Sequence, residues 1–183
     1  VISGSSGGAL VAGMIGTRCL ADRRSILEGG DLAEMLRETL IQLRAESLPE
    51  KRLPLMPIML TQEILTKIVE SWIPDLTFGE AYERSGIIIN ISITPANITG
   101  ASRLLNATTS PHVFIREAVR ASCAVPGVFP AVELCAKGFD GQRRPYIKGM
   151  KWIDGSVGLD LPSRRLGRLY GVNHFITSQT NPA

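Results

Sequence analysis

Several features that mark particular protein classes are missing from this sequence of 183 residues. No apolar run reaches the roughly 18 residues that a membrane-spanning helix requires, and no signal peptide is visible at the start. The net charge is only +3, and the Lys and Arg lack the interleaved aromatic residues of a nucleic-acid surface. We therefore expect neither a transmembrane segment in this chain nor a nucleic-acid partner.

Cysteine and histidine are also scarce. The three cysteines, Cys19, Cys123 and Cys135, lie among apolar or small residues, and none shows C-x-x-C spacing. We interpret them as buried free thiols in a reducing compartment, and we expect no metal site. The two histidines are His112 and His174, so any catalytic imidazole from this chain must be one of them.

The apolar residues predict one domain with a sizeable core, since they make up 44% of a chain of this length. Residues 86–95 are β-branched and apolar almost without interruption, which predicts a strand buried on both faces of a mostly parallel sheet. Strand-like segments alternate with helix-like ones along the chain. This alternation indicates an α/β sandwich, with residues 1–183 as a single domain.

The remaining elements follow from periodicity and from capping residues. Ser110 and Pro111 predict the start of a helix that continues to residue 123. The segment 48–60 is rich in proline and reads as an irregular connection. We also predict helices over residues 7–20, 32–46, 61–72 and 162–170, and strands at residues 1–3, before Asp154 and over 172–179.

The connection between the first predicted strand and the first predicted helix consists of small residues, and Gly4, Ser6 and Gly8 form the pattern G-x-S-x-G there. A serine at such a turn is held in a strained backbone conformation, and its hydroxyl projects from the sheet edge. The Gly7 amide and the positive end of the following helix would then lie where an oxyanion forms. Ser6 is therefore a candidate nucleophile, with a simple tight turn and a phosphate cradle as alternatives.

A serine nucleophile needs a proton acceptor, and the sequence offers three candidates. The order Ser6, an Asp, then His174 fits the chain order of a common hydrolase triad, although a histidine in a core strand is more often structural. His112 is less suitable, because the N-terminus of its predicted helix disfavours a protonated ring. Asp154 ends a short apolar strand before Gly155, so it is either a turn residue or a carboxylate aimed over the strand ends.

Three segments together resemble the patatin-like phospholipase family: GSSGG near the first strand end, ASCAVPGVFPAV, and WIDGS followed by DLP. The resemblance spans nearly the whole chain, is most specific from Leu104 to Pro182, and looks most like the branch of storage-lipid triacylglycerol lipases. It implies a three-layer α/β/α sandwich that is incomplete at its N-terminus. The family's glycine-rich oxyanion loop lies upstream of the elbow strand, so the isolated chain is expected to be nearly inactive.

The resemblance also implies a catalytic Ser–Asp dyad without a cofactor. Ser6 matches the family's nucleophile and Asp154 the acidic residue of its D-G-[A/G] motif, with Gly155 second and Ser156 as a departure at the third position. Gly4 and Gly8 complete the motif around Ser6, and the Gly7 amide matches one oxyanion donor. The expected activity is a lipid acyl hydrolase working through an acyl-enzyme.

The implied substrates are acylglycerols or phospholipids presented at an interface. A cytoplasmic protein, or one held peripherally on a membrane or lipid droplet, would meet them there, and segment 48–60 could be a lid or an ordinary connection. Three readings stay open: the Ser6–Asp154 hydrolase, a triad esterase using His174, and an inactive lipid-binding module. The sequence does not separate hydrolysis from acyl transfer.

Overall fold

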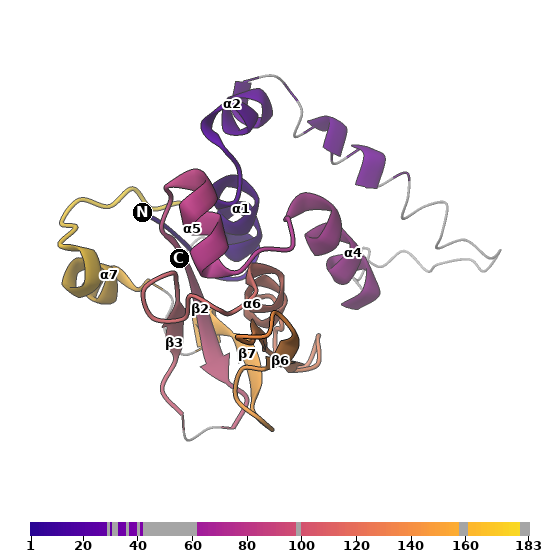
Figure 1. Ribbon diagram of the computed structural model, residues 1–183, viewed down its shortest axis with the longest axis vertical. Helices are drawn as coiled ribbons and strands as arrows, with labels where there is room; N and C mark the ends of the chain where they lie inside the picture. The colour runs from indigo at the N-terminus through magenta and orange to yellow at the C-terminus, as the bar shows by residue number, and fades with distance from the viewer. Residues whose placement is uncertain are drawn as a thin grey trace.

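The computed structural model describes residues 1–28, 30, 33–35, 37–39, 41, 62–97, 100–157 and 161–179 (Figure 1). None of the helices within these residues is long and apolar enough to cross a membrane. The elements in chain order are β1 (Ile2–Gly4), α1 (Gly7–Gly16), α2 (Leu20–Glu28), α4 (Gln62–Trp72), α5 (Phe78–Ser85), β2 (Ile89–Pro95), β3 (Arg103–Leu105), α6 (Ile115–Ser122), β4 (Val132–Glu133), β5 (Cys135–Lys137), β6 (Arg143–Pro145), β7 (Lys151–Asp154), the 3₁₀ helix η1 (Gly155–Val157) and α7 (Ser163–Tyr170).

The main sheet is mixed, whereas we predicted a mostly parallel one. β1 pairs parallel to β2, but β3 and β7 both pair antiparallel to β2, and β4 pairs antiparallel to β7. The apolar run of β2 predicted burial correctly, since six of its seven residues are buried. Burial on both faces does not fix the direction of the neighbouring strands, and the short connection from β2 to β3 favours an antiparallel pair.

Strands β1 and β7 both pair with the same edge of β2. Ile91 pairs with both Gly4 of β1 and Leu105 of β3, so β1 and β3 must lie on opposite edges of β2. Ile93 pairs with both Asp154 of β7 and Arg103 of β3, which puts β7 opposite β3 as well. Consequently β1 and β7 approach each other end to end along one edge, and their last residues flank the position of Ser92.

Helices cover both faces of the sheet, as the predicted sandwich requires. A Cβ on Gly16 of α1 would lie 2.3 Å from the Ile89 side chain, so α1 packs on the face to which Ile89 points. The next residue, Asn90, points to the other face, where its Oδ1 accepts a hydrogen bond from Tyr170 of α7. Figure 1 shows α7 standing apart from α1, α5 and α6. Helix α1 contacts both α5 and α6, and α1 and α6 also contact β2.

The structure corrects two predictions about the secondary structure and adds two helices that were not predicted. Helix α6 begins at Ile115 and not at Pro111, because Val113 and Phe114 form bridges to Ala136 and Thr77. Residues 171–179 form no strand and are almost all exposed. The helices α2 and α5 were not predicted, although Thr77 and Glu80 of α5 form a capping box.

Other predictions are confirmed or lie outside the described residues. Helices α4 and α7 match the predicted helices over residues 61–72 and 162–170, and α1 begins at Gly7 as predicted but ends at Gly16, four residues before the predicted end. The predicted helix over 32–46 is helical at residues 33–35, 37–39 and 41, and its other residues are not described. The predicted connection at 48–60 lies wholly outside the described residues.

Candidate functional site

Ser6 occupies a strained turn between β1 and α1. Its backbone angles are φ 52° and ψ −123°, and it is the only residue other than glycine with a positive φ in the described part of the chain. Such a conformation costs of order 1–3 kcal/mol for a residue with a Cβ, and it persists only where the surroundings enforce it. The strain expected from the sequence is therefore present at Ser6.

Gly4 allows this turn, but Gly8 does not contribute in the way we expected. A Cβ added to Gly4 would lie 2.1 Å from the Gly8 carbonyl oxygen, a distance no real side chain tolerates. A Cβ added to Gly8 would meet nothing within 4 Å. The close approach thus requires a glycine at position 4, with the backbone of Gly8 as the obstacle.

The first turn of α1 presents an unused donor beside Ser6. The Gly8 amide donates to the Ser5 carbonyl and the Ala9 amide to the Ser6 carbonyl, each at 2.9 Å. No acceptor within the described residues takes the Gly7 amide, which is exposed at the start of the helix. A free N–H at a helix N-terminus is suited to an anionic group.

Asp154 ends β7 as a buried carboxyl group, with 2% of the residue exposed. Its Oδ1 accepts hydrogen bonds from the Ser5 hydroxyl at 3.2 Å and from the Ser156 amide at 2.9 Å. The Ser6 hydroxyl is not bonded to it, so the serine in direct contact is the neighbour of the predicted nucleophile. Oδ2 receives no donor from the described part of the chain.

Gly155 lets Asp154 come this close to the central strand. A Cβ on Gly155 would lie 2.3 Å from the Ser92 carbonyl oxygen and 2.4 Å from its carbon. Because these are backbone atoms, they have no rotamer by which to withdraw. The glycine of the D-G pair is therefore a steric requirement of the site.

The C-terminal end of α6 joins Ser6 to Asp154. The Ser122 hydroxyl accepts from the Ser6 amide at 3.0 Å, and the Cys123 thiol donates to the Ser6 carbonyl at 3.3 Å. The Ala124 carbonyl accepts from the Asp154 amide at 3.1 Å. Three consecutive residues thus hold the backbones on both sides of the site.

Sequence reasoning missed Ser5 and Ser122, and only Ser122 carried a usable signal. The buried face of α6 runs through positions 115, 118, 119 and 122, and the last of these is a hydroxyl among apolar residues. A polar group on a buried helix face needs a partner, so it points to a specific contact. Nothing in the sequence distinguishes Ser5 from the other small residues of GSSGG.

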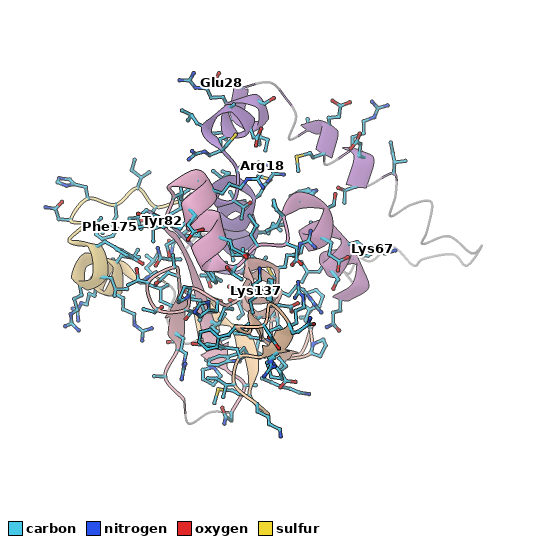
Figure 2. All side chains as sticks on the ribbon, in the orientation of Figure 1. Arg18, Glu28, Lys67, Tyr82, Lys137 and Phe175 are labelled. Atoms are coloured by element: carbon cyan, nitrogen blue, oxygen red, sulfur yellow. The ribbon has the colours of Figure 1, made fainter. Side chains whose placement is uncertain are left out.

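Neither histidine reaches this site. The ring of His174 contacts the side chain of Asn173 at 2.7 Å and is exposed. Phe175, the next residue, is labelled in Figure 2 at the edge of the molecule, away from the sheet. His112 precedes α6 and faces the ring of Phe139, with the two ring centroids 6.3 Å apart. No contact joins either ring to Ser6 or Asp154 among the described residues.

The three thiols differ in burial, whereas we predicted that all would be buried. All three are free; Cys123 is buried, and Cys19 and Cys135 are half-buried. Burial, with a smaller effect from the charge of Asp154, raises the pKa of the Cys123 thiol to about 12. The thiol that contacts the Ser6 turn therefore stays protonated at neutral pH.

Comparisons with known proteins agree on one family. A family model described as patatin-like phospholipase matches residues 1–164. The chain is 36% identical over 200 residues to triacylglycerol lipase SDP1L of Arabidopsis thaliana, with 100% of this chain and 24% of that protein aligned. It is 43% identical over 120 residues to triacylglycerol lipase 4 of Saccharomyces cerevisiae, covering 64% of this chain and 13% of the yeast protein. The chain thus spans about a quarter or less of the length of these relatives.

Replacement of Gly4 by alanine should destabilise the first strand and helix, whereas the same change at Gly8 should not. Gly4→Ala forces a Cβ against the Gly8 carbonyl and should lower the local free energy of unfolding by about 3 kcal/mol. Gly8→Ala has open space and should leave it unchanged or raise it by up to about 1 kcal/mol. Hydrogen exchange of peptides covering residues 1–16, in the full-length protein over a urea series, measures both. Equal effects of the two changes would contradict the steric argument.

Cys123 should resist alkylation in the folded protein. At pH 8 a thiol with a pKa near 12 has about 10³-fold less thiolate than an unperturbed one, and only the thiolate reacts. Iodoacetamide labelling, followed by peptide mass spectrometry, should modify Cys123 at least about 10³-fold more slowly in the native protein than in 8 M urea. Rapid native labelling of this peptide would show that the thiol is not held as described.

Proposed function

Because this chain belongs to the patatin-like phospholipase family, we propose that it carries the Ser6–Asp154 pair of a lipid acyl hydrolase. The observation that carries the proposal is the strained Ser6 turn beside a buried carboxyl group at the end of the neighbouring strand. Strain of this kind is maintained only at a cost to stability, and it is concentrated at functional sites.

The proposed first step is attack of the Ser6 hydroxyl on an ester carbonyl. Asp154 takes the hydroxyl proton while Oγ forms a bond to the carbonyl carbon, and the electron pair of the C=O bond moves to oxygen. Both donors to Asp154 use Oδ1, which supports Oδ2 as the acceptor of this proton. Collapse of the tetrahedral intermediate then breaks the bond to the alcohol, which leaves with the proton held by Asp154.

The second step releases the acyl group. Water gives a proton to Asp154 and attacks the acyl-enzyme, and collapse of the second intermediate returns a proton to Ser6 with release of the carboxylic acid. In both steps the unpartnered Gly7 amide is the proposed oxyanion donor, with the N-terminus of α1 adding a favourable field. Neither a metal nor an organic cofactor takes part in this scheme.

The names of the relatives suggest the substrate class. Two are called triacylglycerol lipases, so we propose that the substrate is an acylglycerol or a related phospholipid. Such molecules lie at a lipid–water interface, which implies a protein that works peripherally on a membrane or lipid droplet. Transfer of the acyl group to an acceptor alcohol would use the same first step as hydrolysis.

Alternative readings have less support. A triad with His174 lacks a contact that would bring the imidazole to Ser6, as its ring contacts Asn173. An inactive lipid-binding module would have no use for strain at Ser6 or for a buried carboxyl group beside it. The contact of Asp154 with Ser5 is the observation that most needs a test, because it offers a second hydroxyl to the same acceptor.

Ser6→Ala and Asp154→Asn should each abolish ester hydrolysis in the full-length protein. Loss of either group removes the nucleophile or its proton acceptor, so kcat should fall by about 10⁴-fold or more. Hydrolysis of a p-nitrophenyl ester and of emulsified triacylglycerol measures the loss. A fluorophosphonate probe should label the peptide that contains Ser6 in the wild-type protein and fail to label it in Ser6→Ala.

Ser5→Ala and His174→Ala serve as the matched controls. Ser5→Ala removes only one of two donors to Asp154, so we expect a loss of at most about 10-fold. His174→Ala should leave kcat unchanged. If Ser5→Ala is as damaging as Ser6→Ala and the probe labels Ser5, the nucleophile assignment is wrong. If His174→Ala abolishes activity, the triad replaces the dyad.

A further inference from the structure

We propose that Ser122 is a positioning residue that sets Ser6 in register with Asp154. Its hydroxyl accepts the Ser6 amide at 3.0 Å and donates to the Ser92 carbonyl at 2.8 Å. One side chain thereby links the strained turn to the strand on which Asp154 is paired. The proposal rests on the proposed function, because it assigns Ser122 a role in the geometry of the Ser6–Asp154 pair.

The Ser122 hydroxyl is buried and makes both of these bonds. The residue is 0% exposed, and a hydroxyl has a single proton, which goes to Ser92. One of its lone pairs accepts the hydrogen bond from the Ser6 amide. In this arrangement water does not compete for either partner, so the two bonds fix the separation of Ser6 from Ser92.

A hydrogen bond to Ser92 links Ser6 to the part of β2 that lies next to Asp154. The last residues of β1 and β7 flank it on one edge of β2, since Gly4 pairs with Ile91 and Asp154 pairs with Ile93. A constraint between Ser6 and Ser92 is therefore also a constraint between Ser6 and Asp154. The Ser122 hydroxyl provides this constraint.

Helix α6 is a rigid support for the hydroxyl. It packs on β2 and β7, and near its N-terminus the Arg116 guanidinium donates to the carbonyls of Ile73 at 2.6 Å and Glu70 at 2.7 Å. Residues 123 and 124, which follow directly, bond to the backbones of Ser6 and Asp154. Groups held on a packed helix are placed more precisely than groups held on a loop.

Removal of this hydroxyl should impair turnover more than binding. Ser122→Ala leaves the Ser6 amide and the Ser92 carbonyl unpaired, and the turn is then free to relax toward ordinary backbone angles. A misplacement of about 1 Å can cost about 10²-fold in rate. We expect kcat to fall by about 10- to 100-fold with KM changed by less than about 2-fold, because no contact with the substrate is lost.

Ser110→Ala is the matched control for this experiment. Ser110 is also a buried serine, with 5% of the residue exposed, but its hydroxyl contacts the Tyr146 hydroxyl at 3.3 Å and not the Ser6 turn. Both variants lose one buried hydroxyl, so a purely structural effect should appear in both. The kcat loss and slower fluorophosphonate labelling of Ser6 should appear only in Ser122→Ala.

A second measurement tests the geometry without relying on activity. The Ser6 amide donates to Ser122, so hydrogen exchange of this amide, followed by NMR, should be at least about 10-fold faster in Ser122→Ala and unchanged in Ser110→Ala. Wild-type exchange together with wild-type kcat in Ser122→Ala would overturn the proposal. Ser6→Ala shows which of the two proposals fails. If Ser6→Ala stays active, the proposed function is wrong. If Ser6→Ala is inactive but Ser122→Ala behaves as wild type, only the positioning role of Ser122 is wrong.

Discussion

The site depends on the close approach of three backbones around Ser92 of β2. β1 and β7 run toward each other along one edge of that strand and stop on either side of this residue. The backbone that follows β7 lies too close to β2 for a side chain at position 155, because a Cβ there would overlap the Ser92 carbonyl. Gly4 and Gly155 therefore allow the close approach: they let the turn after β1 and the carboxyl group at the end of β7 both lie next to Ser92.

The Asp154 carboxyl group is held by hydrogen bonds from neutral donors. Among the described residues, no ion pair includes Asp154, which is instead contacted by a hydroxyl and an amide. The same apolar surroundings raise the pKa of the adjacent Cys123 thiol. The site therefore combines a buried carboxyl group held by neutral donors with a thiol that stays protonated at neutral pH.

The sequence predicted the turn and the main elements because these depend on local patterns. The small residues of GSSGG predicted the strained Ser6, and an almost continuous apolar run predicted the buried β2. Strand direction and the start of α6 depend on partners that are distant in sequence, such as the bridge from Phe114 to Thr77, so local patterns could not fix them. The run that contains His174 is strand-like in composition, yet it gains no pairing partner in the described residues.

The two serines of the turn illustrate why motif position and direct contact can disagree. Ser5 follows β1 directly, and its hydroxyl donates to the Asp154 carboxyl group. Ser6 bears the strain, and its amide and carbonyl are held by Ser122 and Cys123, so its backbone is the more strongly constrained of the two. In the proposed mechanism, the constraint on the backbone of Ser6 aims its Oγ, and the contact from Ser5 orients the Asp154 carboxyl group. In the same proposal, Ser5 keeps its hydrogen bond to Oδ1 of Asp154 while Ser6 gives its proton to Oδ2.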